Sequence, residues 1–195
     1  MSANKRRLPS GAKAVFRGRA FDVARVSVAN AAGGPRLERE IVCHGPSVVI
    51  VARDRAGRIL FERQYRAAIG ASLWELPAGG VEPGESALAA ARRELTEETG
   101  YTARRWRRLG RFYSSPGFVD EELHVFLAAE LLPGPPRREP DEQIRLRWLT
   151  LADLRSWQAA RRLHDAKSLA ALALSHAALT LPRRPPKIRA MTLAR

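Results

Sequence analysis

A loop rich in glycine and proline runs directly into an alanine-rich segment that ends at a glycine, and no other feature constrains the fold as strongly. The loop spans residues 79–84, and Ser86 follows it in a position to cap a helix. Gly100 stands where a helix commonly ends, because glycine adopts the left-handed backbone conformation without steric cost. Alanine and leucine recur between these residues at the spacing of one helical face. We therefore expect a helix over residues 86–99.

Three glutamates project from the second half of this helix. Glu94 shares a face with Glu97 and Glu98, since positions three and four apart lie on one side of a helix. Two like charges about 4 Å apart repel by roughly 4 kcal/mol at an effective dielectric constant of about 20. A hard divalent cation converts that repulsion into attraction, and Mg²⁺ binds through a few carboxylates together with substrate phosphate oxygens. The sequence therefore predicts a magnesium site, with Mn²⁺ as a substitute ion.

Composition limits the kind of protein that carries this site. A chain of 195 residues, 45% of them hydrophobic, is long enough for one sizeable core. The formal net charge of +14 comes mainly from arginine and is spread along the chain, so it permits a nucleic-acid partner without requiring one, and we expect none. Cys43 is the only cysteine, which excludes an intrachain disulfide and a thiolate metal site and favours the reducing cytoplasm. No apolar run reaches transmembrane length, so we expect no membrane partner.

Short β-prone segments precede and follow the glutamate helix, and two further helical segments close the fold. The apolar run 47–52 predicts a buried strand, and the turn at 54–57 leads to a second strand at 58–65, so we expect a hairpin. The whole pattern predicts an α/β sandwich with a mixed sheet, preceded by a small antiparallel β meander. The other expected strands are 14–17, 20–29, 37–43, 74–77, 106–113, 122–131 and 144–150, and the closing helices are 151–160 and 165–178.

The residues around the glutamates resemble the Nudix box. Gly79, Glu85 and the segment 93–101 match that motif at each of its fixed positions. A solvated acidic helix face, the common role of such charges, would not explain Gly79, Glu85 and Arg93. The resemblance implies a Nudix-type α/β/α sandwich and the hydrolysis of a nucleoside diphosphate linked to another group. Such a reaction depends on positioning and charge neutralisation.

The resemblance also implies roles for the residues of the box. Arg93 would orient the carboxylates through a bidentate pair. Glu85 would act from the loop, either as an anchor behind the metal ligands or on a peripheral metal. The implied ligands of the central Mg²⁺ are Glu94 and Glu98, with Glu97 as a further ligand and the backbone carbonyl of Ala78.

Residues outside the box resemble the ADP-ribose pyrophosphatase subfamily. Pro116 lies 16 positions after Gly100 (116 − 100), as the proline that marks this subfamily does. The segments 75–80 and 118–121 are similar to the same subfamily, although a proline at a strand exit is by itself an ordinary structural feature. Arg66 would contact the diphosphate and Glu121 the terminal ribose. Arg39 and Glu40 would reach the substrate across the interface of a homodimer, and the remaining expected substrate-contacting residues are Glu75, Gly80, Ser115, Pro116 and Gly117.

The catalytic base is expected in the loop before residue 144. That loop contains Glu139, Asp141 and Glu142. Glu142 stands where the subfamily shows a glutamate that faces the metal, while the usual position of the base falls near Pro140, so Glu139 or Glu142 would take the proton from water. The alternative is that all three acids are solvated loop charges.

The leading interpretation is a Mg²⁺-dependent, homodimeric enzyme that hydrolyses ADP-ribose to AMP and ribose 5-phosphate. The alternatives are hydrolysis of another sugar nucleotide or a dinucleotide, RNA decapping, and a sensing module that binds ADP-ribose or nucleic acid. An aromatic pair that brackets adenine in the subfamily has no clear counterpart after Gly18, so the base specificity stays open. The expected parts are a basic flexible lead (1–12), an antiparallel β element suited to dimerisation (13–44), a Nudix hydrolase domain (45–180) and a basic, proline-rich tail (181–195).

Overall fold

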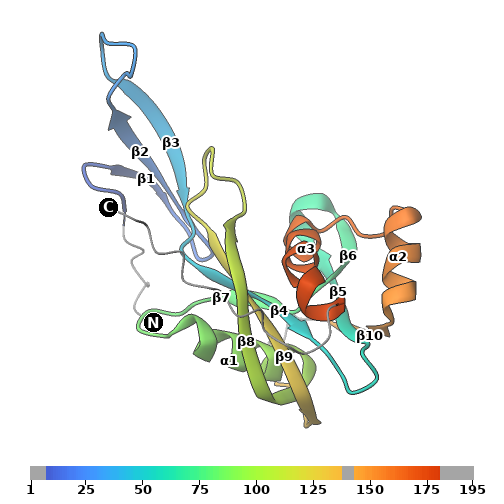
Figure 1. The fold of residues 1–195 in the computed structure, drawn as a ribbon. Helices are drawn as coiled ribbons and strands as arrows, with labels where there is room; N and C mark the ends of the chain where they lie inside the picture. Colours follow the sequence, from blue (N-terminus) through green and yellow to red (C-terminus); the bar gives the residue numbers. More distant parts are fainter. Residues whose placement is uncertain (1–7, 138–142, 181–195) are drawn as a thin grey trace, which may run out of the picture.

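A four-stranded mixed sheet forms the centre of the molecule (Figure 1). The computed structural model describes residues 8–137 and 143–180. Strands β4 (Ser47–Ala52) and β9 (Glu122–Pro133) lie parallel in the middle of this sheet. Strand β7 (Ala78–Gly80) pairs antiparallel with β4, and β8 (Tyr101–Tyr113) pairs antiparallel with β9. The predicted mixed sheet is therefore confirmed.

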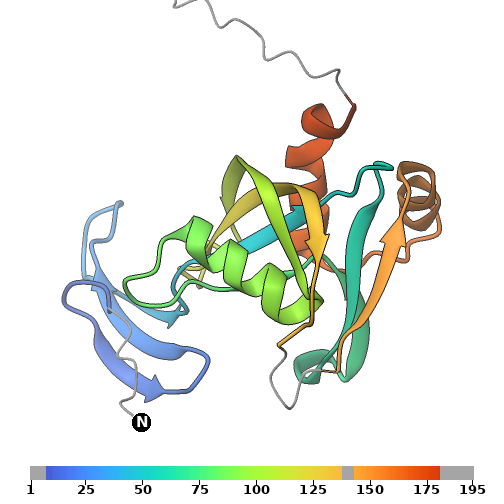
Figure 2. The ribbon, with the colours of Figure 1, turned by 90° about the horizontal axis from the view of Figure 1, so that it is seen from below.

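Strand β4 is buried on both faces because a helix covers each side of the sheet. All six of its residues are buried. Val48 packs in the apolar cluster beneath α1 (Ala87–Thr99), whereas its neighbour Val49 packs in the cluster that includes α3 (Ala166–Thr180). Figure 2 shows the two helices on opposite sides of the sheet. This arrangement confirms the predicted α/β/α sandwich, and it explains why β4 reads as an unbroken apolar run.

A second, three-stranded sheet lies beside the first and corrects one prediction. It has the order β10-β5-β6, with β5 at Ile59–Arg66, β6 at Ala71–Glu75 and β10 at Arg145–Leu149, and a short 3₁₀ turn joins β5 to β6. The predicted hairpin between β4 and β5 is wrong. A single bridge, Arg53 to Ile59, joins them at the turn, because both edges of β4 are already paired with β7 and β9.

Helix α1 ends at the predicted Thr99 and begins at Ala87, one residue after the predicted start, with Ser86 as its cap. The Ser86 hydroxyl accepts a hydrogen bond from the Ala89 N–H at 3.2 Å. Gly100 has a φ of 77°, and its N–H donates to the Thr96 carbonyl at 2.9 Å. Strand β8 follows at once, so it begins earlier than the predicted residue 106. Helix α2 (Leu151–Ala159) starts with a capping box that Thr150 and Asp153 form.

The predicted antiparallel meander is confirmed as a separate sheet that projects from one end of the molecule (Figures 1 and 2). It consists of β1 (Lys13–Arg17), β2 (Asp22–Val28) and β3 (Leu37–Cys43). The Val42 N–H donates to the Phe118 carbonyl at 2.8 Å, which joins β3 to the segment between β8 and β9. The sheet is thus fastened to the part of the chain that carries Pro116.

Strand β8 forms the edge of the four-stranded sheet opposite β7. Its exposed arginines are Arg104, Arg105, Arg107, Arg108 and Arg111.

None of the helices in the described ranges has the length and apolar character of a membrane span. Residues 1–7 of the expected lead and the expected tail at 181–195 lie outside the described part of the chain.

Candidate active site

Arg93 binds three carboxylates, one from the loop before α1 and two from α1 itself. Its Nε and Nη2 donate to the two carboxylate oxygens of Glu85 at 3.2 and 3.0 Å. Its Nη1 donates to Glu94 at 2.7 Å and to Glu97 at 3.1 Å, and Nη2 also donates to the Gly80 carbonyl at 2.9 Å. The hydrogen bonds with Glu85 raise the pKa of Arg93 most strongly, and in turn they hold the pKa of Glu85 below its ordinary value. The expected bidentate pair of Arg93 is therefore made with Glu85.

Gly79 is required by the position of Glu94. A Cβ atom at residue 79 would lie 2.1 Å from the Glu94 carboxyl carbon, far inside van der Waals contact. Strand β7, which contains Gly79, pairs with β4, so the backbone at this point has little freedom to move away. A glycine at this position of the motif thus leaves room for the carboxylate of the helix to lie against the strand.

Glu98 links helix α1 to β7 through a hydrogen bond with the backbone of Ala78. It is 4% exposed, and its Oε2 accepts a hydrogen bond from the Ala78 N–H at 3.2 Å. The carboxylates of the helix and the Ala78 backbone are hard oxygen donors, which fit Mg²⁺ by their chemistry. In the described ranges no three acidic, histidine or cysteine side chains converge as a metal cage, and Glu94 and Glu97 each direct an oxygen at Arg93. A cation would therefore compete with Arg93 for these two carboxylates.

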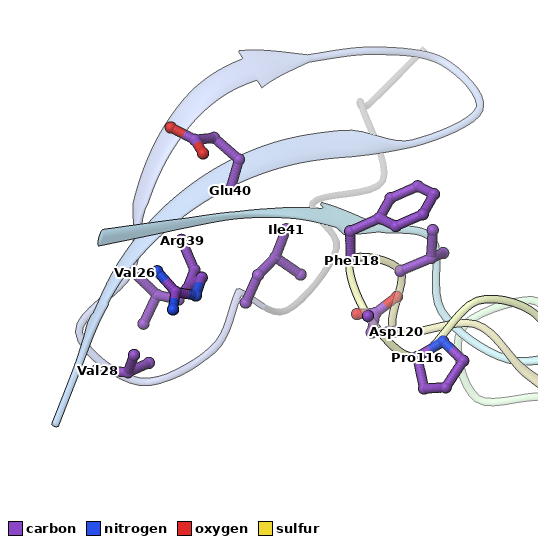
Figure 3. Close-up of a pocket in the computed structure, with 10 residues that line it drawn as sticks. Val26, Val28, Arg39, Glu40, Ile41, Pro116, Phe118 and Asp120 are labelled. Carbon is purple, nitrogen blue, oxygen red and sulfur yellow. The ribbon is translucent and has the colours of Figure 1, made fainter. Parts of the chain in front are cut away.

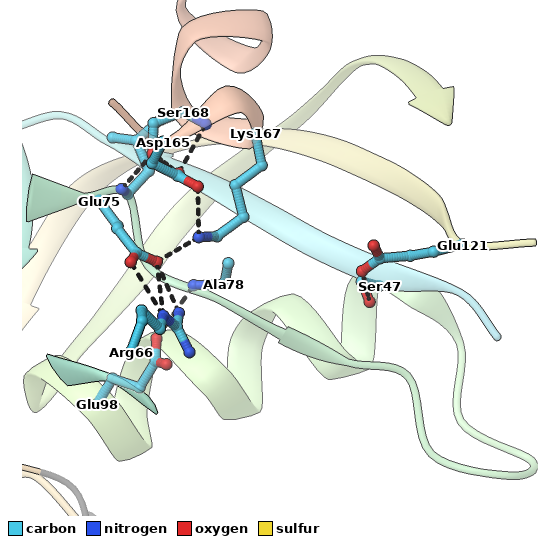
Figure 4. A network of polar contacts seen from close by, with 10 residues as sticks. Ser47, Arg66, Glu75, Ala78, Glu98, Glu121, Asp165, Lys167 and Ser168 are labelled. Carbon is cyan, nitrogen blue, oxygen red and sulfur yellow. Dashed lines mark hydrogen bonds and ion pairs between the residues drawn. The ribbon is translucent and has the colours of Figure 1, made fainter. Parts of the chain in front are cut away.

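Arg66 and Glu75 form a bidentate ion pair across β5 and β6 (Figure 4). Arg66 Nε donates to Glu75 Oε1 at 2.9 Å, and Nη2 donates to Oε2 at 2.6 Å. The Glu75 side chain is 1% exposed, whereas that of Arg66 is 38% exposed. Burial acts to raise the pKa of Glu75, but the hydrogen bonds from Arg66 and the charge of Lys167 outweigh burial and hold this pKa below its ordinary value.

The first turn of α3 contributes side chains that the sequence interpretation missed. Lys167 Nζ donates to Glu75 Oε2, and Ser168 Oγ accepts a hydrogen bond from the Leu76 N–H at 2.7 Å. Asp165 caps the helix through the Ser168 N–H at 3.0 Å. An aspartate before a helical pattern signals a helix start. No signal in the sequence shows which strand that start contacts.

Glu121 is held by residues at the start of β4. Ser47 Oγ donates to Glu121 Oε1 at 2.7 Å, and His44 Nδ1 lies 3.7 Å from the same oxygen. The next acid, Asp120, accepts hydrogen bonds from the backbone N–H groups of His44 at 2.7 Å and Gly45 at 3.1 Å. Figure 4 shows the Ser47–Glu121 pair as separate from the Arg66–Glu75 pair. Neither Ser47 nor His44 was predicted to take part in the site.

Residues of the N-terminal sheet and of the segment before β9 line one hollow, among them Arg39, Glu40, Pro116 and Gly117; the side chains of Arg39 and Glu40 lie on opposite faces of β3 (Figure 3). The hollow has a volume of about 250 Å³ and is lined by β2, β3 and residues 116–120. Glu40 accepts a hydrogen bond from Arg25 Nε at 3.3 Å. The Ser115 carbonyl accepts from the Phe118 and Val119 N–H groups, which closes the turn after Pro116. The structure therefore places Arg39, Pro116 and Gly117 around one hollow, whereas the Glu40 side chain lies on the other face of β3 beside Arg25.

The two acids predicted to supply the catalytic base, Glu139 and Glu142, lie outside the described residues, so their roles stay predictions.

The comparisons with known proteins agree with this geometry. The family model named NUDIX domain matches residues 44–172. The chain belongs to the Nudix family. This Nudix chain is 38% identical over 160 residues to the ADP-ribose pyrophosphatase of Bacillus subtilis (strain 168), a match that covers 81% of this chain and 86% of that protein. It is 36% identical over 141 residues to the methanol dehydrogenase activator of Bacillus methanolicus, which covers 71% of this chain and 76% of that protein.

A solved structure confirms the Nudix fold. The crystal structure of an ADP compounds hydrolase has a TM-score of 0.77 to this chain at 22% identity, and the match covers 92% of this chain and 97% of that one. At this identity the likeness concerns the fold alone. The family membership and the similarity to an ADP-ribose pyrophosphatase make the protein a Nudix pyrophosphohydrolase.

Proposed function

We propose that this Nudix enzyme hydrolyses the diphosphate of ADP-ribose, with Mg²⁺, to give AMP and ribose 5-phosphate. The observation that carries the proposal is the convergence of Arg66 and Glu98 on one short segment. Arg66 is bound to Glu75, and Glu98 is bound to Ala78. Residues three apart in an extended chain are separated by at most about 10 Å. A basic group and an acidic helix thus lie within the reach of one diphosphate, in a chain similar to an ADP-ribose pyrophosphatase.

The residues of the site have complementary tasks in this reaction. Glu94, Glu97 and Glu98, with the Ala78 carbonyl, would hold Mg²⁺, which when bound offsets phosphate charge and makes a water molecule more acidic. Arg93 holds Glu94 and Glu97 on one side, and Glu85 anchors Arg93 in turn. Arg66 presents a positive charge to the diphosphate, and Glu121, held by Ser47, accepts a hydrogen bond from a hydroxyl of the terminal ribose. Glu139 or Glu142 takes the proton of the attacking water, and Mn²⁺ is expected to replace Mg²⁺.

We also infer that the enzyme works as a homodimer through its N-terminal sheet. Strand β1 and the turn that follows it expose Val15, Phe16 and Phe21 to solvent, with exposed fractions of 56%, 53% and 40%. Burial of such side chains against a second copy is favourable. A partner seated there could bring Arg39 and Glu40 to its neighbour's substrate. A monomeric mass from light scattering at the assay concentration would contradict this inference.

The test of the proposed function is a product-resolved screen of nucleoside diphosphate derivatives with the wild type and Glu98→Gln. We expect ADP-ribose to be cleaved to AMP and ribose 5-phosphate only when a divalent metal is present. The substitution removes one metal-binding charge while keeping the shape, so kcat should fall by at least about a hundredfold, the scale of losing a key electrostatic contact. Thermal unfolding of both proteins serves as the control for folding.

Three outcomes would contradict the proposal. Cleavage of a different sugar nucleotide or a dinucleotide, with no AMP released from ADP-ribose, would change the substrate. Near-normal turnover by Glu98→Gln would remove Glu98 from the metal site. Site-specific DNA binding without turnover, measured by gel shift, would favour a sensing module instead.

A further inference from the structure

The first turn of α3 reaches the active site although it lies far away in the sequence. Lys167 and Glu75 are separated by 92 positions, and Lys167 Nζ donates to Glu75 Oε2 (Figure 4). The Lys167 side chain is only 19% exposed. Because the Leu76 N–H also donates to Ser168 Oγ, this turn is fastened to two consecutive residues at the end of β6.

Lys167 is held in a fixed position by the cap of its own helix. Asp165 Oδ2 accepts hydrogen bonds from Ser168 N at 3.0 Å and from Ser168 Oγ at 2.5 Å, and Ser168 is fully buried. The other carboxylate oxygen, Asp165 Oδ1, lies 3.1 Å from Lys167 Nζ. The positive end of a helix dipole offsets the charge of a capping carboxylate. Lys167 therefore remains the main counter-charge that this turn supplies to Glu75.

Glu75 lies between two cations. Arg66 bonds to it through Nε and Nη2, which leaves the Nη1 edge of the guanidinium for another acceptor. Hydrogen bonds with Glu75 are the main cause that raises the pKa of Arg66, so Arg66 stays charged. With Lys167 present, one buried carboxylate is shared between two positive groups. Glu62 and Asp165 also act electrostatically on Arg66. Without Lys167, the positive charge of Arg66 would therefore be offset more fully by the carboxyl groups around it, and Arg66 would attract a diphosphate less strongly.

We propose that Lys167 is a positioning residue whose charge offsets Glu75, so that Glu75 orients Arg66 without cancelling the positive charge that Arg66 presents to the substrate diphosphate. This inference rests on the function proposed above. It gives α3 a part in substrate binding, although the helix packs on the opposite face of the sheet from the glutamate helix.

The experiment compares Lys167→Met, Lys167→Arg and a matched control, Arg155→Met, which removes one positive charge from an exposed position of α2. With ADP-ribose and Mg²⁺, Lys167→Met should raise KM by about tenfold, which corresponds to about 1.4 kcal/mol. Its kcat should change by less than about threefold, because the metal-binding glutamates are untouched. Lys167→Arg should restore KM to within about threefold of the wild type, and Arg155→Met should behave as the wild type.

A double substitution separates charge compensation from a structural role. If Lys167 acts by offsetting Glu75, the loss of its charge should be compensated when the charge of Glu75 is removed as well. The double variant Glu75→Gln/Lys167→Met has the same net charge around Arg66 as the wild type, so its KM should stay within about threefold of the wild-type KM. The double variant buries no uncompensated carboxylate, so it decides the question even if Lys167→Met alone does not fold.

The outcomes distinguish this inference from the proposed function. If the wild type does not hydrolyse ADP-ribose, both fail. If it does, and folded Lys167→Met keeps the KM of the wild type, only the role of Lys167 is overturned. The same holds if the folded double variant has a KM about tenfold above that of the wild type, or if Lys167→Arg is as impaired as Lys167→Met.

Discussion

At the scale of single residues, the site depends on contacts that leave no spare room. Gly79 has no side chain, and the carboxylate of Glu94 occupies the space that a side chain would take. Arg93 uses both edges of its guanidinium, one for Glu85 and the other for Glu94 and Glu97. We therefore expect a small change at Gly79 or Arg93 to displace the carboxylates of the site and to leave the fold intact.

We expect Gly79→Ala to impair catalysis with little loss of stability. The added methyl group would displace the flexible end of Glu94 and leave the backbone in place, so the cost falls on metal binding. We expect kcat to fall at least about tenfold, in the lower range for a displaced electrostatic group. Measurements of kcat against Mg²⁺ concentration and of thermal unfolding check this.

The adjacent Gly80→Ala is the comparison, because a methyl group at residue 80 meets no atom within 4 Å. Because Gly80 is also expected to contact the substrate, the comparison uses the Mg²⁺ dependence of kcat, which we expect Gly80→Ala to keep and Gly79→Ala to lose. Equal losses in the two variants would show that the contact with Glu94 is not the cause.

At the scale of elements, the junction between α1 and β8 depends on one glycine. Gly100 has positive φ, and a Cβ atom there would lie 2.3 Å from the carbonyl oxygen of Gly134. The residue thus ends the helix and allows the segment after β9 to pass close by. Both requirements concern the backbone, which cannot yield as a side chain can.

We expect Gly100→Ala to destabilise the protein by more than about 2 kcal/mol, since the left-handed conformation alone costs roughly 1–2 kcal/mol for alanine. Gly70→Ala separates the two effects. Gly70 has a φ of 62°, but a Cβ atom there meets nothing within 4 Å. Urea unfolding should show a clearly smaller loss for Gly70→Ala, and equal losses would mean that the contact with Gly134 does not matter.

The same elements show how far the sequence leads. Helix α1 was predicted to within one residue because Ser86 and Gly100 are local signals, and β4 was predicted because its six-residue apolar run can be recognised without knowing its partner strands. The hairpin was wrong because pairing is decided by distant strands, here β7 and β9. Strand β7 itself was read as loop, since a segment made of alanine and glycine has no β propensity.

In the candidate site, too, the contacts that are local in the sequence were predicted and the long-range contacts were not. The order of residues in the box identified the glutamates and Arg93, whose contacts are local to one helix and its preceding loop. The contact of Lys167 with Glu75 joins elements far apart in the chain, so no spacing could reveal it. Arg66 was found by resemblance, and its partner Glu75 was named without any indication that the two residues bind each other.

At the scale of the whole molecule, buried charge links the second sheet to α3. Glu75 is almost inaccessible to water and is ionised because Arg66 and Lys167 bind it. Its pKa in the folded state is lowered from the ordinary value of 4.5. A lowered folded-state pKa contributes stability above pH 4.5, and that contribution is lost as the pH falls through the folded-state pKa.

We therefore expect the free energy of unfolding to fall as the pH is lowered below about 4.5. Glu75→Gln should be less stable at neutral pH, because Arg66 and Lys167 lose their partner, but its stability should depend less on pH in the acid range. Urea unfolding at a series of pH values checks both. A parallel acid dependence in the two proteins would show that other carboxylates govern acid unfolding.

The row of exposed arginines along β8 has a consequence for how these molecules behave in concentrated solution. An edge strand offers unpaired backbone groups to any neighbouring chain, and this one is thirteen residues long. Arg105 and Arg111 pair with Glu130 and Glu122 of β9, but two joined edges would still bring the guanidinium groups of Arg104, Arg107 and Arg108 together. Mutual repulsion thus guards the longest strand of the fold against fibre-like stacking, and this protection weakens as salt screens the charges.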